Sequence, residues 1–314
     1  YSLFGKMNNK AKIFEFLYKN NNDSYNINHI SRLLGVSVGS AFKILKEFEK
    51  NGYAIVSKEK NALLYKINMN DKTKEFYEKL EEEESAKSKK RTKVICMIGP
   101  STNNHITIKK LIENGMDAAS IDISGLDARS LLKMLQNIKQ VSDEIPIILD
   151  ISSTKDKQWI RFALKNDLDF VCISAKNAGD IQQINKILGY KDIKQVIGEK
   201  IKVIAKLDKE SLKNYKEIIE EAYGVVIDRR KFASAKIELL PKLQKDIIVE
   251  CNKHGKLAII SGYVLDSMIE SRQPLQSENY NISNVGLEGG SCLMLSNETA
   301  DGKYPVESLK ALSR

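Results

Sequence analysis

The sequence contains little proline, tryptophan, histidine or cysteine, residues whose abundance is typical of particular classes of protein. It holds five prolines, one tryptophan, three histidines and four cysteines among 314 residues. The cysteines lie far apart and form no CxxC or HxxC spacing, so a zinc site is not expected. Buried, reduced thiols are the simpler interpretation. No metal and no cofactor is predicted for this chain. The cysteines are Cys96, Cys172, Cys251 and Cys292.

Long apolar runs are also absent. No run approaches the roughly 18 residues of a membrane-spanning helix, and the first residues lack the apolar core of a signal peptide. We therefore expect a cytoplasmic protein with no membrane partner. The hydrophobic content of 42% and the charged content of 29% are typical of globular proteins, and the length suits two domains.

Positive charge is concentrated at the start of the chain. Residues 1–70 hold eleven Lys and Arg against five Asp and Glu, so they contribute +6 of the net +9. The pattern of apolar residues predicts three helices and then two strands, with Ser37 as the N-cap of the third helix. The helices are expected at 10–19, 26–34 and 37–50, and the strands at 53–57 and 63–67.

This order of elements, together with ISRLLGVSVGSAFKILKEFEKNGYAIV at 30–56, resembles winged helix-turn-helix regulators of bacteria and archaea. The resemblance implies a domain at 1–70 whose third helix enters the major groove while the wing contacts phosphates. DNA is expected rather than RNA, because a helix reads a B-form major groove. A domain used only for protein contacts is the alternative. The implied nucleic-acid-binding residues are Arg32, Ser37, Ser40, Lys43, Lys46, Lys58 and Lys60.

A helical, charged linker is predicted at 71–91, where an acidic block precedes a basic one. Over 92–314, apolar strands alternate with amphipathic helices, which indicates a parallel sheet. Eight such repeats are the number in a closed (β/α)8 barrel; an open doubly wound sheet is the alternative, and the absence of a Gly-rich phosphate loop favours the barrel. The strands are expected at 93–98, 118–123, 145–151, 170–174, 202–206, 224–227, 257–261 and 292–295. The helices are expected at 106–114, 128–141, 157–166, 178–188, 212–222, 241–254 and 263–271.

Two motifs at the ends of this region carry a second resemblance. TKVICMIGPS at 92–101 and LMLSNETADGKYP at 293–305 are similar to the opening strand and the closing strand and loop of the pyruvate kinase barrel. The fold class implied is α/β, a TIM barrel of the pyruvate kinase type with an N-terminal winged helix. The third strand runs almost directly into the third helix, so the lid domain inserted there in the family is expected to be missing. The family's carboxy-terminal domain is also expected to be missing.

The resemblance further implies which active-site positions are kept. Lys206 matches the family's lysine at the substrate phosphate, and Asp208 stands in the place of a magnesium-binding glutamate. Lys231 falls where the second magnesium carboxylate belongs, and a cation there would repel a divalent ion. The family remnants are Lys206, Asp208, Asp150 and Ser124.

Two other positions depart from the family. Ser120 stands for the arginine that holds nucleotide phosphate, and Gly262 for the threonine that helps to protonate the enolate. We therefore predict a catalytically inactive pyruvate kinase-like protein that acts as a DNA-binding transcription regulator. The alternatives are an adaptor on RNA or the ribosome, and an enzyme with a different, metal-free reaction on an anionic substrate.

The barrel of this regulator is expected to act as an anion sensor or as an assembly scaffold for a homodimer. An anionic metabolite would bind at the mouth of the barrel, where several cations are predicted to gather. The alternative is that these cations pair with leftover carboxylates. The predicted anion pocket consists of Lys206, Arg229, Arg230 and Lys231, with Lys155 nearby.

Overall fold

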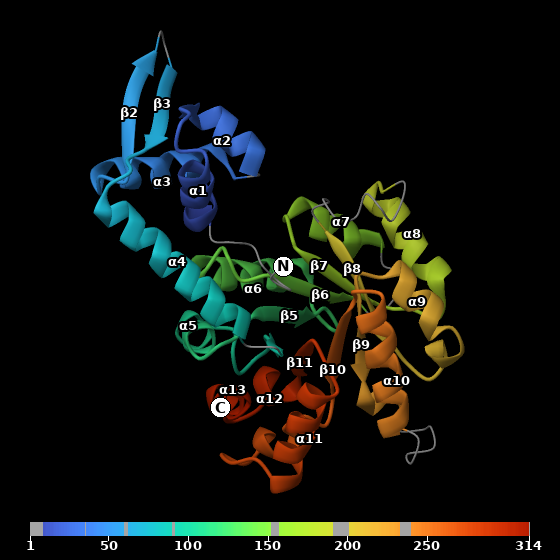
Figure 1. Ribbon diagram of the computed structural model, residues 1–314. Helices are drawn as coiled ribbons and strands as arrows, with labels where there is room; N and C mark the ends of the chain where they lie inside the picture. Colours follow the sequence, from blue (N-terminus) through green and yellow to red (C-terminus); the bar gives the residue numbers. More distant parts are fainter. Residues whose placement is uncertain are drawn as a thin grey trace. The chain divides into compact units, whose positions relative to one another are not determined.

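The computed structural model describes residues 9–34, 36–59, 62–89, 92–151, 157–190, 201–232 and 240–313. The chain divides into two compact units, Tyr1–Lys90 and Arg91–Arg314, which are blue to cyan and green to red in Figure 1. Within the described ranges, no helix is both long and apolar enough to cross a membrane.

The first unit contains helices around a small antiparallel sheet, whose strands lie in the order β1-β3-β2. Ser37 is the N-cap of the third helix, and its hydroxyl accepts a hydrogen bond from the Ser40 amide at 3.2 Å. The three predicted helices and two strands are confirmed to within a few residues. The elements are α1 (Asn9–Lys19), β1 (Tyr25–Asn26), α2 (Ile27–Leu34), α3 (Val38–Lys50), β2 (Ala54–Glu59), β3 (Ala62–Ile67) and α4 (Asp71–Lys89).

An aromatic cluster forms the core of this unit. Phe14 of α1 packs edge-on against Phe48 of α3 and against Phe76 of α4, with ring centroids 5.4 and 4.6 Å apart. Tyr18 stacks on Tyr77 with centroids 3.9 Å apart. The first turns of α4 therefore contribute to the core of the first unit rather than only connecting the two units.

The second unit is a closed barrel of eight parallel strands, as predicted (Figure 1). Around the barrel the strands lie in the order β10-β11-β4-β5-β6-β7-β8-β9. The strands are β4 (Lys93–Met97), β5 (Ala118–Asp122), β6 (Ile147–Ile151), β7 (Phe170–Ser174), β8 (Lys202–Leu207), β9 (Gly224–Asp228), β10 (Leu257–Ser261) and β11 (Cys292–Leu295). The helices are α5 (His105–Glu113), α6 (Ala128–Val141), α7 (Lys157–Lys165), α8 (Ala178–Leu188), α9 (Tyr215–Glu221), α10 (Leu240–Lys253), α11 (Gln276–Leu287), α12 (Asn297–Ala300) and α13 (Pro305–Leu312), with short 3-10 turns η2 (Ser211–Lys213), η3 (Arg229–Phe232) and η5 (Asp266–Ile269).

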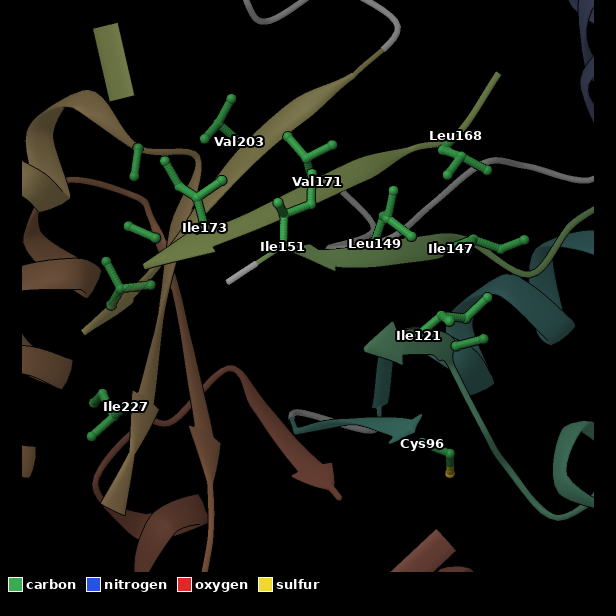
Figure 2. Close-up of a cluster of buried hydrophobic side chains, with 14 of the residues drawn as sticks. Cys96, Ile121, Ile147, Leu149, Ile151, Leu168, Val171, Ile173, Val203 and Ile227 are labelled. Carbon is green, nitrogen blue, oxygen red and sulfur yellow. The ribbon is translucent and has the colours of Figure 1, made fainter. Parts of the chain in front are cut away.

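Side chains alternate between the two faces of the barrel strands. On β6, Ile147, Leu149 and Ile151 join the apolar core with residues of the surrounding helices, and Figure 2 shows them beside their neighbours on β7. The residues between them must face the barrel interior, because successive side chains of a strand point to opposite faces. Asp150 and Lys206 illustrate this: they touch across the intervening strand β7.

One predicted helix is wrong. The segment 263–271 holds only the 3-10 turn η5, and the next helix, α11, begins at Gln276. Tyr263 adopts a left-handed φ of 53°, which is incompatible with a right-handed helix beginning at that residue. Glu278 instead accepts hydrogen bonds from the Ser267 and Leu275 amides, at 2.9 and 2.8 Å, and so fixes the non-helical chain before α11.

Candidate functional site

The mouth of the barrel is built from the inward-facing residues at the carboxyl ends of its parallel strands. The pairing of neighbouring strands sets Asp122 of β5 opposite Asp150 of β6, and Asp228 of β9 opposite Ser261 of β10. Lys206 of β8 lies opposite Ser174, the last residue of β7. In (β/α)8 barrels this end carries the active site, because the strand termini and the following loops converge there.

A buried ion pair stands at the centre of this mouth. The Lys206 ammonium contacts Asp150 Oδ2, and the side chains of the two residues are 15% and 5% exposed. Burial disfavours the charged lysine, but attraction by Asp150 outweighs it, so the pKa of Lys206 lies above its ordinary value. Burial raises the pKa of Asp150, and the Lys206 ammonium opposes that rise. Lys206 is therefore a protonated cation held in one place by a carboxylate.

Other charged groups surround this pair. Asp122 and Asp228 both act electrostatically on Asp150, and Asp228 also acts on Arg229 and Arg230. The Cys172 thiol of β7 lies fully buried beside this pair, and its pKa is raised by burial and by Asp150. Sequence reasoning did not single out Asp228. Asp228 is the last inward-facing residue of a barrel strand, and this position could have identified it from the sequence.

Asp208 and Lys231, which match the magnesium-binding positions of the family, are not arranged to hold a divalent ion. Asp208 Oδ1 accepts hydrogen bonds from the Glu210 and Ser211 amides, at 2.8 and 3.1 Å, and so shapes the turn after β8. Lys231 is exposed and cationic. Across the described part of the chain, no group of three or more His, Cys, Asp and Glu side chains is placed to hold a metal ion.

Ser120 and Gly262 have different surroundings at the mouth. The Ser120 hydroxyl is fully buried and has no hydrogen-bond partner among the described residues. Gly262 has a φ of 73°, and a Cβ there would lie 3.0 Å from Asp228 Oδ1 and from Arg230 Cγ. A threonine at this position would therefore need both a strained backbone and a displaced Asp228.

The closing motif ties three loops together. Glu298 is fully buried and accepts hydrogen bonds from the Ser296 and Leu265 amides, at 2.8 and 3.1 Å. Burial raises the pKa of Glu298, opposed by the backbone donors. Thr299 donates from Oγ1 to the Met97 carbonyl at 2.9 Å. The motif thus fixes the ends of β4, β10 and β11 relative to one another. Ser124, another predicted remnant, donates its amide to Asp122 at 2.8 Å.

The cations predicted to form an anion pocket have separate partners. Lys206 contacts Asp150, whereas Arg230 pairs with Asp266 at 2.7 Å. Arg229 donates to the Gly262 and Tyr263 carbonyls and to the Asn281 side chain of α11. Lys155 lies outside the described residues. A shared anion pocket at the mouth remains a prediction.

The residues predicted to bind nucleic acid lie on α2, α3 and the β2–β3 hairpin. Lys46 pairs with Glu49 at 2.7 Å, and Ser37 donates its hydroxyl to Ser40 at 2.9 Å. Lys60 lies outside the described residues. The exposed positions among them are Arg32, Ser37, Lys43, Lys46 and Lys58.

Comparisons with known proteins agree with the barrel. Residues 144–309, more than half of the chain, match the model of the pyruvate kinase barrel domain. The pyruvate kinase of Methanocaldococcus jannaschii is 36% identical over 181 residues, covering 57% of this chain and 38% of that protein. The Clostridium perfringens pyruvate kinase is 34% identical over 173 residues, covering 54% and 35%. The Trypanoplasma borreli enzyme is 33% identical over 210 residues, covering 65% and 41%. The chain spans less than half the length of these curated relatives.

These findings overturn the predicted function. Relatives about a third identical to this chain are named pyruvate kinase, which points to an enzyme and contradicts an inactive transcription regulator. The ribosome adaptor and the unrelated metal-free reaction are corrected with it, in favour of a pyruvate kinase-like enzyme. The error came from giving the replaced positions, Ser120, Lys231 and Gly262, more weight than the similarity of the whole barrel. The chain belongs to the pyruvate kinase family.

Proposed function

We propose that the barrel is a pyruvate kinase-like enzyme that acts on a small anionic substrate at its mouth, with Lys206 as the cation that meets the substrate. The observation that carries the proposal is the Lys206–Asp150 pair at the carboxyl end of β8, at the position of the family's lysine. A fixed ammonium can stabilise negative charge that develops on a substrate oxygen without having to reorganise.

The charge balance adds a condition to this proposal. Asp122, Asp150 and Asp228 lie near Lys206, so an anionic substrate must contact the ammonium without approaching these carboxylates. Ser120 is expected to change how the nucleotide phosphate is held, and Gly262 to change how the enolate is protonated. Only residues 152–156 separate β6 from α7, which supports the absence of a lid domain inserted there. A cytoplasmic location and a homodimer remain predictions.

The test is the formation of pyruvate from phosphoenolpyruvate and ADP by the full chain, with potassium and magnesium or manganese supplied. A second readout is deuterium incorporation at C3 of pyruvate, which reports proton transfer separately from phosphoryl transfer. We expect Lys206→Met to reduce turnover by about 100-fold or more, the scale of losing one preorganised donor to developing charge.

Lys202→Met is the matched control for Lys206→Met. Lys202 lies on the same strand and faces the same side, but at the opposite end, where its ammonium lies 4.5 Å from the ring centroid of Tyr223. This variant should keep most of the activity. If the folded wild-type chain shows neither pyruvate formation nor deuterium exchange, the enzyme proposal fails. Equal losses of turnover in Lys206→Met and Lys202→Met would show that Lys206 is not the cation that meets the substrate.

A second proposal concerns the first unit, for which we infer a winged-helix fold and a nucleic-acid partner. The order of its elements, three helices and then a hairpin, supports this fold. Lys43 and Lys58 are exposed, and within the described residues neither forms an ion pair. Both are therefore available to phosphate oxygens. In this proposal the unit is a binding appendage of an enzyme, with DNA expected before RNA.

Binding to a DNA duplex and to RNA over a series of salt concentrations tests this second proposal. Lys43→Ala with Lys58→Ala should weaken binding and lower the slope against the logarithm of salt concentration by about 2, since each phosphate contact contributes about 1. The control is Lys242→Ala with Lys245→Ala on α10, where both side chains are exposed. Absence of salt-dependent binding to either nucleic acid would refute the proposal.

A further inference from the structure

A pocket of about 440 Å³ opens on the flank of the barrel, between η3, α10 and α11. It is separate from the Lys206–Asp150 pair, since neither residue lines it. Its volume lies within the about 300–1,000 Å³ typical of small-molecule sites. Its apolar wall includes Ile227, Phe232, Leu240 and Leu243, and its polar groups include Arg229 and Asn281.

Arg229 is fixed in this pocket from three directions. Its Nε donates to the Gly262 carbonyl at 2.7 Å, its Nη1 to Asn281 Oδ1 at 2.7 Å, and its Nη2 to the Tyr263 carbonyl at 3.0 Å. Asn281 is held in turn, because its Nδ2 donates to the same Tyr263 carbonyl at 3.0 Å. A guanidinium has five N–H groups, so one N–H on each Nη is left for another acceptor.

The charge of Arg229 lacks a close counter-charge. Burial lowers the pKa of Arg229 to about 10, opposed chiefly by the more distant Asp266. Among the residues that the structure describes, no carboxylate lies within ion-pair distance of Arg229, whereas Arg230 pairs directly with Asp266. Glu288 also lines the pocket; it accepts a hydrogen bond from Gln244 at 2.8 Å and, like Asp266, acts on Arg229 without pairing with it. A partly buried cation without a paired anion is costly, and an anionic ligand would offset that cost.

We propose that this pocket binds a small monocarboxylate with an apolar body. Its carboxylate would accept the two remaining N–H groups of Arg229, and its body would lie against Phe232 and Leu243. The planar guanidinium suits a carboxylate because the two can form paired, charge-assisted hydrogen bonds. The apolar wall favours a ligand that also loses hydrocarbon surface to the pocket. The Lys206–Asp150 pair does not line this pocket.

Phenylacetate is the probe for the test, and phenylacetamide is its neutral control of nearly the same shape. Both are titrated into the full chain, with calorimetry for affinity and thermal unfolding for stabilisation of the barrel. We expect phenylacetate to bind at least about tenfold more tightly than the amide, because hydrogen bonds to a charged group are about twice as strong as neutral ones. The melting temperature should rise with phenylacetate concentration.

Three variants locate the binding. Arg229→Met should abolish the preference for phenylacetate, whereas Lys231→Met removes an exposed cation two residues away and should keep it. Ser277→Trp leaves Arg229 and its hydrogen bonds in place and fills the pocket from α11, so it should prevent binding even if Arg229→Met folds poorly. Equal affinity for the two probes, equal loss in Lys231→Met, or unchanged binding in Ser277→Trp would each overturn the proposal.

Discussion

The Lys206–Asp150 pair allows one prediction to be worked out in detail. Lys206→Met removes the ammonium and leaves Asp150, which is 4% exposed, without its partner. Breaking a buried pair by removing one partner typically costs about 3–5 kcal/mol. For a barrel of this size, a loss of 1 kcal/mol lowers the melting temperature by about 2–4 °C. We therefore expect a decrease of about 6–20 °C at neutral pH.

The pH dependence of this variant has a definite sign. Burial and the neighbouring Asp122 and Asp228 raise the pKa of Asp150, and the variant loses Lys206, which opposes that rise. Below the pKa of an unfolded aspartate, about 3.9, Asp150 is protonated in both states and the loss of stability is small. As the pH rises through the raised folded pKa, the unfolded state loses its proton first and the folded variant becomes less stable.

Urea unfolding of the barrel at pH 5, 7 and 8.5, followed by circular dichroism, measures this effect. The difference between wild type and Lys206→Met should grow with pH. The double variant Lys206→Met with Asp150→Leu should recover most of the loss, because it removes the uncompensated carboxylate as well. A single variant that loses less than about 1 kcal/mol, or a double variant that recovers nothing, would refute the reasoning.

Three further predictions concern positions away from this pair. Gly262→Ala should destabilise the barrel by about 2 kcal/mol, and by more than Gly125→Ala, as measured by chemical denaturation. Both glycines have a positive φ, but of the two only Gly262 leaves no room for a Cβ. Phe14→Ala should cost about 3–5 kcal/mol in the first unit and leave the barrel's transition unchanged, as followed by calorimetry. Thr299→Val should cost about 1 kcal/mol, because the hydroxyl that donates to the Met97 carbonyl is lost, measured by urea unfolding.

Local patterns predicted most of the barrel. Strands such as Phe170–Ser174 and Leu257–Ser261 match their expected bounds, because short apolar runs between polar turns leave few alternatives. The helix predicted after β10 is wrong because Glu278 fixes the preceding chain through hydrogen bonds to the Ser267 and Leu275 amides, which a local pattern does not show. The cap at Ser37 was predicted because its signal lies within four residues.

The sequence by itself determined the order of strands and helices, the family resemblance, and which residue types reach the ends of the strands. Only the tertiary structure decided which charges meet. Lys206 pairs with Asp150, 56 positions away, because β6 and β8 each pair with β7 and both side chains point into the barrel. Arg229 instead bonds to residues 262, 263 and 281, because η3 turns it toward α11. A run of cations in the sequence indicates that counter-charges or acceptors are needed. Which groups lie close enough to bond to these cations is decided only when distant segments pack together.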